Sequence, residues 1–306
     1  MLVYITRRLV VMVPVLLLVV TLVFFAFQVI PGDPARLFVG PDASQDAVEA
    51  VRRELGLDQP MVVQYATYMR RLVTGDLGRS IAMRRPVVDE LVRVFPATFR
   101  LAVVSILVSM VVGVPLGLIA AINRGGVWDH VSSMVAVLGL SMPAFWLGLL
   151  LIYLLSVELR WLPSTGEAGW ENYIMPTICL STFSIAFIAR MTRSSMLEVI
   201  RHDYVRTARA KGVPDWGVIV RHGLRNALLP IVTVVGLRFG YMLGGAVVVE
   251  EIFAWPGMGR LLIVAVAQRD IPVVQGLLLM FSAAFVLVNL LVDVSYAFLD
   301  PRIRYR

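Results

Sequence analysis

Few side chains in this sequence have the type and spacing that enzyme chemistry requires. The histidines His130, His202 and His222 lie far apart, and no cluster of histidine, cysteine and carboxylate has the spacing of a metal site. The serines have no paired base at a recognisable spacing. The one lysine, Lys211, is followed by Gly212 and a valine, so the chain lacks the Gly-Lys-Ser/Thr loop that binds the phosphates of ATP. We therefore expect no catalytic residue, no cofactor and no bound metal in this chain.

A cationic segment over residues 190–225 is the most informative part of the sequence, with eight cations and three acids. Residues 196–210 predict a basic helix that continues from the preceding apolar run. Gly212 suits the end of that helix, and Pro214 with Asp215 suits the start of a second, short helix that ends near His222. The pattern predicts an ordered element between two apolar runs. A loop that only orients the chain in a membrane explains the charge but not the Gly and Pro punctuation.

The composition places these segments in a membrane protein. Hydrophobic residues make up 58% of the 306 and charged residues only 16%, where soluble domains are nearer a quarter charged. The mean hydropathy is +0.81. These figures exclude a disordered, fibrous or nucleic-acid-binding chain and leave an integral membrane protein, with lipid as a partner. The net charge of +7 arises mainly from cations between apolar runs, as membrane topology requires. Cys179 is the only cysteine and forms no disulfide within the chain.

Six apolar runs are long enough, or nearly so, to cross a bilayer as helices. They are Leu9–Ile30, Pro96–Ile122, Val131–Val157, Tyr173–Ala189, Ala227–Val249 and Val273–Phe298. The first has a basic start but is too long for the apolar core of a signal peptide, so we expect a retained helix. The third contains Pro143, which we expect to bend it.

The distribution of Arg and Lys in the short loops predicts the orientation. Arg7, Arg8, Arg124, the 190–225 segment and the C-terminal arginines fall on one side, against Arg160, Arg260 and Arg269 in the short loops of the other. We expect both termini and the cationic segment to be cytoplasmic.

Residues 31–95 form the largest segment expected outside. Pro31, Gly32, Asp33 and Pro34 have turn chemistry, and helices are predicted over Ser44–Leu55 and Pro60–Val73. Gly75, Gly78 and Pro86 then mark a loop. A compact lobe is favoured over an inert connector. Further along, Leu261–Ala267 is too short to span and predicts a re-entrant or interfacial helix.

Two arginines fall inside the predicted spans. Arg100 lies near the end of its span, where its long side chain can reach the interface. Arg238 lies deep in the fifth span, where an unpaired charge is costly. Two alternatives remain open, and a structural pair is slightly favoured: Arg238 pairs with Asp293, or it faces a pathway and meets a substrate carboxylate.

Several motifs resemble those of permease subunits of ABC importers. The stretch Arg206-Thr-Ala-Arg-Ala-Lys-Gly212, followed by His222-Gly-Leu-Arg-Asn-Ala, is similar to the cytoplasmic loop of these permeases, with Ala208 and Gly212 in its Ala-x3-Gly pattern. Arg206 and Thr207 replace an acid and an alanine of the general pattern, as in the dipeptide/oligopeptide/nickel branch. Further matches are Pro31-Gly-Asp-Pro-Ala, Leu55-Gly-Leu-Asp-Gln-Pro, Gly75-Asp-Leu-Gly, Ser141-Met-Pro-Ala-Phe, Val249-Glu-Glu-Ile-Phe and Trp255-Pro-Gly-Met-Gly.

This resemblance implies an all-α type I ABC importer permease in the bacterial inner membrane. It implies a division into residues 1–94 (first span and periplasmic lobe), 95–299 (permease core) and 300–306 (cytoplasmic tail). The implied partners are a second homologous permease, two ATPase subunits that bind ATP and Mg, and a periplasmic or lipid-anchored substrate-binding protein. The implied cargo is dipeptides, oligopeptides or glutathione, with nickel chelates as the alternative.

The resemblance also implies roles for particular residues. Those expected to couple to the ATPase are Arg206, Thr207, Ala208, Lys211, Gly212, Pro214, Asp215, His222, Arg225 and Asn226. Those expected to serve docking on the outer lobe are Pro31, Gly32, Asp33, Pro34, Gly75, Asp76 and Gly78. Arg238 and Pro143 are the pathway candidates. A secondary transporter, the rival class, usually carries paired repeats and acids inside its spans.

Overall fold

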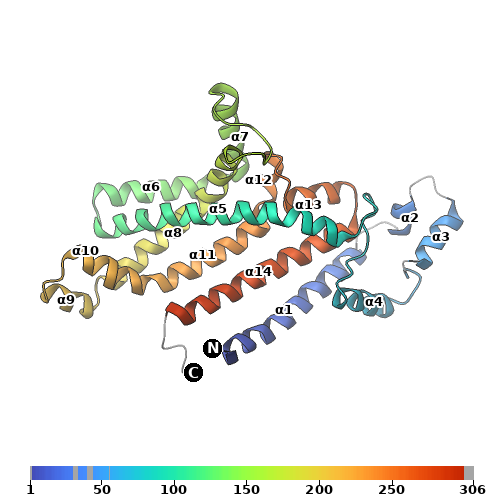
Figure 1. Ribbon diagram of the computed structural model, residues 1–306, viewed down its shortest axis with the longest axis horizontal. Coiled ribbons are helices and arrows are strands. Elements are labelled where there is room, and N and C mark those ends of the chain that lie inside the picture. Colours follow the sequence, from blue (N-terminus) through green and yellow to red (C-terminus); the bar gives the residue numbers. More distant parts are fainter. Residues whose placement is uncertain (1, 30–33, 40–43, 55, 300–306) are drawn as a thin grey trace.

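The computed structural model describes residues 2–29, 34–39, 44–54 and 56–299, and the regular elements in these ranges are helices (Figure 1). Pro31, Gly32, Asp33 and the tail 300–306 lie outside the described residues. The elements are α1 (Leu2–Val29), α2 (Pro34–Val39), α3 (Gln45–Glu54), α4 (Met61–Val73), α5 (Val87–Ile122), α6 (Val127–Ser141), α7 (Ala144–Leu151), η1 (Ile152–Glu158), α8 (Glu171–Val199), α9 (Asp203–Ala210), α10 (Asp215–Gly217), η2 (Val218–Leu224), α11 (Arg225–Gly245), α12 (Val247–Ile252), α13 (Met258–Ala267) and α14 (Ile271–Leu299).

Five helices in the described residues, α1, α5, α8, α11 and α14, are long and apolar enough to span a membrane, and α6 with α7–η1 makes a sixth when the bent pair counts as one. The bend expected at Pro143 in the run Val131–Val157 is present, and it is sharp enough to divide the run into α6 and the pair α7–η1, which meet at 99°. Proline causes the break: Pro143 has no N–H to donate and forces Met142 into an extended conformation (φ −84°, ψ 120°). In Figure 1, α7 consequently projects away from the other spans.

The bundle is organised around α8, which packs against α5, α6 and α11, while α14 packs against α11 and α1. Small residues permit the closest approach. A Cβ at Gly117 of α5 would lie 2.3 Å from the carbonyl oxygen of Ala189 in α8. Small residues hold helices together in membranes because apolar side chains gain little there from leaving lipid.

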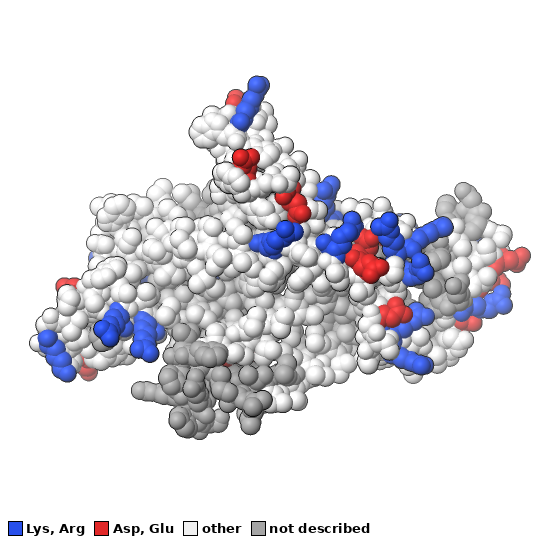
Figure 2. Space-filling model, viewed as in Figure 1, with Lys and Arg blue, Asp and Glu red and all other residues white. Residues whose placement is uncertain are grey.

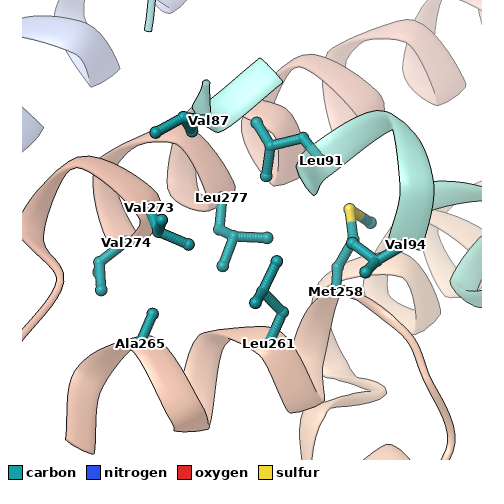
Figure 3. Close-up of a cluster of buried hydrophobic side chains, with 9 residues drawn as sticks. All are labelled: Val87, Leu91, Val94, Met258, Leu261, Ala265, Val273, Val274 and Leu277. Atoms are coloured by element: carbon teal, nitrogen blue, oxygen red, sulfur yellow. The ribbon is translucent and has the colours of Figure 1, made fainter. Parts of the chain in front are cut away.

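A compact apolar cluster closes one end of the bundle (Figure 3). It joins the start of α5, the helix α13 and the start of α14, with Val87, Leu91, Met258, Leu261 and Leu277 among its members. The short helix predicted over 261–267 is present, and it packs Leu261 and Ala265 into this core.

The helices α2, α3 and α4 form a lobe beyond the end of α1 (Figure 1). Ser44 caps α3, since its Oγ accepts a hydrogen bond from the N–H of Ala47 at 3.3 Å. Figure 2 shows charged side chains over this lobe, over α9–α10 and on the α7 projection, with a largely uncharged surface between the first two. Such an uncharged belt is what a chain that crosses a bilayer must present.

Candidate coupling site and outer-face junction

The cationic segment contains a helix break at residues 200–202 that the sequence did not indicate. The single helix expected over 196–210 is wrong, because α8 ends at Val199 and α9 starts only at Asp203, after His202 in an extended conformation. The break folds α9 back so that Val205 is buried, 1% exposed, among Met196, Val218 and Ile231. The burial of Val205 favours the turned arrangement.

The turn after α9 is fixed by its backbone. Gly212 has φ +78°, its N–H donates to the Arg209 carbonyl at 2.9 Å, and the N–H of Val213 donates to the Ala208 carbonyl at 3.2 Å. These two bonds form a Schellman motif, so the predicted helix end at Gly212 is confirmed. Across the turn, the Arg209 Nε lies 3.1 Å from the Asp215 Oδ1.

The second short helix does not end where the sequence indicated. Instead of stopping near His222, the chain passes from α10 through η2 directly into α11. Gly223 does not end the helix because the segment is packed: Gly223 is buried, and a Cβ there would lie 3.0 Å from the Met196 side chain. Packing thus outweighs the weak helix preference of glycine. As a consequence, α10 is continuous with a membrane-spanning helix.

An exposed surface results, which we call the coupling surface. It consists of Arg206, Thr207, Lys211, Pro214, Asp215 and Trp216, all exposed. Trp216 was missed in the sequence, and its side chain is 68% exposed. The sequence signal for Trp216 was a large aromatic residue within a charged loop. Such a residue favours contact with a partner protein when it is exposed.

The other residues of the expected coupling set lie in α9, in the turn after it, in η2 and at the start of α11. Ala208 is half-buried on α9, and Gly212 is exposed at the turn. Arg225 and Asn226 start α11, where the Asn226 Nδ2 donates to the Tyr204 hydroxyl of α9 at 2.9 Å. His222 lies in η2.

An ion pair that the sequence did not suggest joins two helices near this site. Arg193 of α8 donates to both oxygens of Asp129 at the start of α6, at 2.6 and 2.8 Å. The N–H of Gly125 donates to the same carboxylate at 2.9 Å. Such bidentate pairs fix geometry as well as charge.

The two pathway candidates lie in different parts of the fold, Arg238 within α11 and Pro143 between α6 and α7. The guanidinium carbon of Arg238 lies 4.0 Å from the ring centre of Phe187, 5.0 Å from that of Phe183 and 5.5 Å from that of Tyr241. These are cation–π distances. Arg238 takes part in none of the ion pairs found among the described residues. Pro143 lies at the break before α7.

At the end of the bundle formed by the start of α5 and by α13, a buried carboxylate organises the segment after α12. Glu250 is fully buried and accepts hydrogen bonds from the Thr98 hydroxyl at 2.6 Å, from the N–H of Gly259 at 2.7 Å and from the N–H of Arg260 at 3.3 Å. Burial raises the pKa of Glu250, and these three bonds oppose that rise. The buried Trp255 donates to the Ala97 carbonyl at 3.1 Å.

A second buried carboxylate, Asp270, holds the loop between α4 and α5. It accepts hydrogen bonds from the Ser80 hydroxyl and from the N–H groups of Ile81 and Ala82, both at 3.1 Å. We call the contacts of Glu250 and Asp270 the outer junction. In the sequence Glu250 appeared only within the motif Val249-Glu-Glu-Ile-Phe and Asp270 was not singled out, because the sequence does not indicate which distant backbone groups will surround an acid.

The described members of the expected docking set fall in two segments. Pro34 begins α2, whereas Gly75, Asp76 and Gly78 follow α4. Both glycines of the second segment have positive φ, and the Asp76 Oδ1 accepts a hydrogen bond from the N–H of Gly78 at 2.8 Å.

Known proteins resemble this chain over its whole length. Residues 113–305 match the family described as binding-protein-dependent transport system inner membrane component, and residues 1–102 match the family of its N-terminal part. The glutathione transport system permease protein GsiC of Escherichia coli strain K12 is 48% identical over 306 residues, all of both chains. GsiC of Shigella dysenteriae serotype 1 has the same identity and coverage.

Two solved structures share the fold. A chain of the MetNI methionine ABC transporter in an inward-facing conformation superposes with a TM-score of 0.55 at 20% identity, covering 69% of this chain and 96% of that one. A chain of an amino acid ABC transporter gives a TM-score of 0.52 at 16% identity, covering 68% and 92%. With its apolar helices, its all-α fold and family matches over most of its length, the chain belongs to the inner-membrane permease components of binding-protein-dependent ABC importers.

Proposed function

We propose that this chain is one of two permease subunits of an ATP-driven importer of small peptides, with glutathione as the favoured cargo. The full-length identity of 48% to glutathione permeases supports the cargo. The single observation that carries the ATP-driven mechanism is the coupling surface, which is exposed and continuous through η2 with α11. Dipeptides and nickel chelates remain the alternative cargoes.

The coupling surface is where two ATPase subunits, which bind ATP and Mg, act on the membrane helices. Their closure displaces α9 and α10, and the bonds across the Gly212 turn make these helices move together. Because α10 runs into α11 without a break, the displacement reaches the helix that carries Arg238. The spans then reorient and admit the cargo from outside.

Arg238 is the pathway residue. A charge in this position is expensive against lipid, so its half-exposed side chain faces protein or water in the assembled importer. Rings of α8 and α11 hold the guanidinium, and a carboxylate of the cargo is the counter-ion that the described chain does not provide. Peptides and glutathione carry such carboxylates.

The outer lobe is the docking site of the substrate-binding protein, and the docking segments contain Pro34, Gly75, Asp76 and Gly78.

This docking role requires that both termini lie in the cytoplasm. Reporter fusions at Arg124 and Ala210 should then read cytoplasmic and one at Gln64 external, and a cytoplasmic signal at Gln64 contradicts the topology.

The test of the function is uptake by the purified complex in proteoliposomes. Glutathione, a dipeptide and a nickel chelate are offered with ATP and, separately, with an ion gradient alone. ATP-dependent uptake of glutathione is expected, and Arg238→Gln should lower it while binding of the cargo to the isolated binding protein stays unchanged. Uptake driven by the gradient without ATP would indicate a secondary transporter.

A further inference from the structure

A cavity of about 490 Å³ lies between the outer lobe and the spanning helices α1 and α14. Its membrane side is mostly apolar, with Phe24 and Phe27 of α1 and Leu279 of α14, while Gln28 and Gln275 add two amides there. The helix α4 covers the cavity with Val63 and Tyr68. The loop over residues 76–81 forms a further wall. The cavity is thus bounded by the membrane-spanning helices α1 and α14 on one side, and by α4 and the loop over residues 76–81 on the other.

The depth of the cavity follows from the spans that line it. Gln28 is the last residue of the apolar stretch of α1, and Ile271 is the first of that of α14, and both border the cavity. The cavity therefore lies where hydrocarbon gives way to the polar headgroup layer. The molecules that fill such a position have a polar head and an apolar tail.

The polar side of the cavity is cationic. Arg71 and Arg79 line it, and neither has an acidic partner among the described residues. Arg79 donates to the Arg84 carbonyl at 3.0 Å, and Asp76, the one acid in the lining, accepts the N–H of Gly78. The Tyr68 hydroxyl is buried and has no hydrogen-bond partner among the residues that the structure describes, and burial raises its pKa to about 12, so it remains a donor.

We propose that this cavity binds one anionic phospholipid of the outer leaflet. The phosphate lies between Arg71 and Arg79, and an acyl chain follows Phe24, Phe27 and Leu279 into the bilayer. Basic pockets between membrane helices bind anionic headgroups for this reason. A free peptide fits less well, because its charged ends would have to lie against the apolar residues of α1 and α14.

The experiment uses the complex purified through a tag on this chain. It is placed in nanodiscs of equal parts phosphatidylglycerol and phosphatidylcholine, extracted with mild detergent, and weighed by native mass spectrometry. Wild type should retain one phosphatidylglycerol. Arg71→Gln and Arg79→Gln should each lower retention about fivefold, the effect expected of one cation at a membrane surface. Arg70→Gln is the matched control, since Arg70 is the exposed neighbour of Arg71 and does not line the cavity.

A second variant tests the cavity itself. Val63→Trp fills the space and leaves both arginines in place, so it should also remove the lipid, and an unchanged elution volume of the complex shows that it folds. Equal retention of the two lipids by wild type overturns the proposal. The proposal is also overturned if Arg70→Gln lowers lipid retention as much as Arg71→Gln does. Displacement of the lipid by glutathione overturns it as well, because the cavity would then be a substrate site.

Discussion

The coupling surface and the outer junction differ in where their polar interactions lie: exposed at the first and buried at the second. Around the coupling surface the ion pairs are exposed: Arg206 with Asp203 at 3.6 Å, and Arg209 with Asp215 at 3.1 Å. Exposed pairs of this kind stabilise by about 0–1 kcal/mol. At the outer junction, Glu250 and Asp270 are buried and accept hydrogen bonds from backbone N–H groups. Loss of one buried acceptor leaves each donor unsatisfied, at about 1–3 kcal/mol.

This difference matches what each region must do. Under the proposed function the coupling surface must stay accessible to an ATPase subunit, so its order comes from the backbone geometry at Gly212 and from the buried Val205. The outer junction joins α12 to α5 and α13 through Glu250 and holds the loop between α4 and α5 through Asp270, so its polar groups can be buried and bonded. Breaking one feature in each region should therefore give different losses: coupling in the first, stability in the second.

The largest effect is expected for Gly212→Val. A residue with a side chain at φ +78° costs about 1–2 kcal/mol, and valine is among the least tolerant of this conformation. The Schellman turn opens and α10 changes direction relative to α9. We expect normal membrane insertion but loss of substrate-stimulated ATP hydrolysis by the complex.

The matched control is Gly125→Val. Gly125 has φ +76° and open space around it, in the loop between α5 and α6. It carries the same backbone cost outside the coupling surface. Equal loss of stimulated hydrolysis in both variants would show that strain, and not the direction of α10, is responsible.

Glu250→Ala tests the outer junction. It leaves the Thr98 hydroxyl and the N–H groups of Gly259 and Arg260 without their acceptor, which should lower stability by about 3 kcal/mol or more. The thermal midpoint of the complex in detergent measures this. Glu251→Ala is the control. Glu251 is the next residue along the chain and is exposed, so its removal should change the thermal midpoint little. A similar midpoint for both variants would contradict the buried role of Glu250.

The raised pKa of Glu250 adds a pH dependence to the same measurement. The folded protein binds this proton more tightly than the unfolded chain does, so the stabilisation is complete below the ordinary value of about 4.5 and is lost as pH rises through the raised pKa. Glu250→Gln does not titrate. The midpoint of wild type minus that of the variant should therefore fall as pH is raised from 4.5, and a difference that grows with pH would contradict the assignment.

Asp270→Asn should give a local effect. The amide cannot accept all three hydrogen bonds from Ser80, Ile81 and Ala82, so the loop should detach from α14 more often. The loop contains Arg79, Arg84 and Arg85, and trypsin cleavage there should accelerate several-fold. Asp89→Asn, an exposed carboxylate on α5, is the control and should leave the cleavage rate unchanged.

The sequence predicted the spans better than the sites because the two depend on different information. Apolar runs and local punctuation identify most of the spans, α3, α4, α13 and the turn at Gly212. They do not identify the break at His202, which depends on burying Val205 against residues as distant as Ile231. Nor do they identify the partners of Glu250, since Thr98 lies 152 positions away. The sequence places Trp216 in the charged loop, but only the structure shows that its side chain is exposed and therefore a candidate for partner contact.

The smallest effect is expected for Arg206→Glu, the variant that tests the coupling surface by charge alone. The Arg206 side chain is 78% exposed and its contact with Asp203 is weak, so the fold should not change. If the surface meets acidic groups of an ATPase subunit, reversing this charge weakens association severalfold at low salt. Debye screening should reduce the difference from wild type as salt is raised.

Arg124→Glu is the control for that measurement, because Arg124 is exposed in the loop between α5 and α6 and lies outside the coupling surface. The measurement is co-purification of the ATPase subunits at 50 and 500 mM salt. The Debye length is longer than about 10 Å at the first concentration and shorter at the second. A loss with Arg206→Glu alone, at low salt alone, identifies a specific charge contact beside the Gly212 turn. Equal loss with Arg124→Glu would mean that the whole cationic face attracts the partner. The coupling surface would then act through its shape, set by Gly212 and Trp216, and not through Arg206.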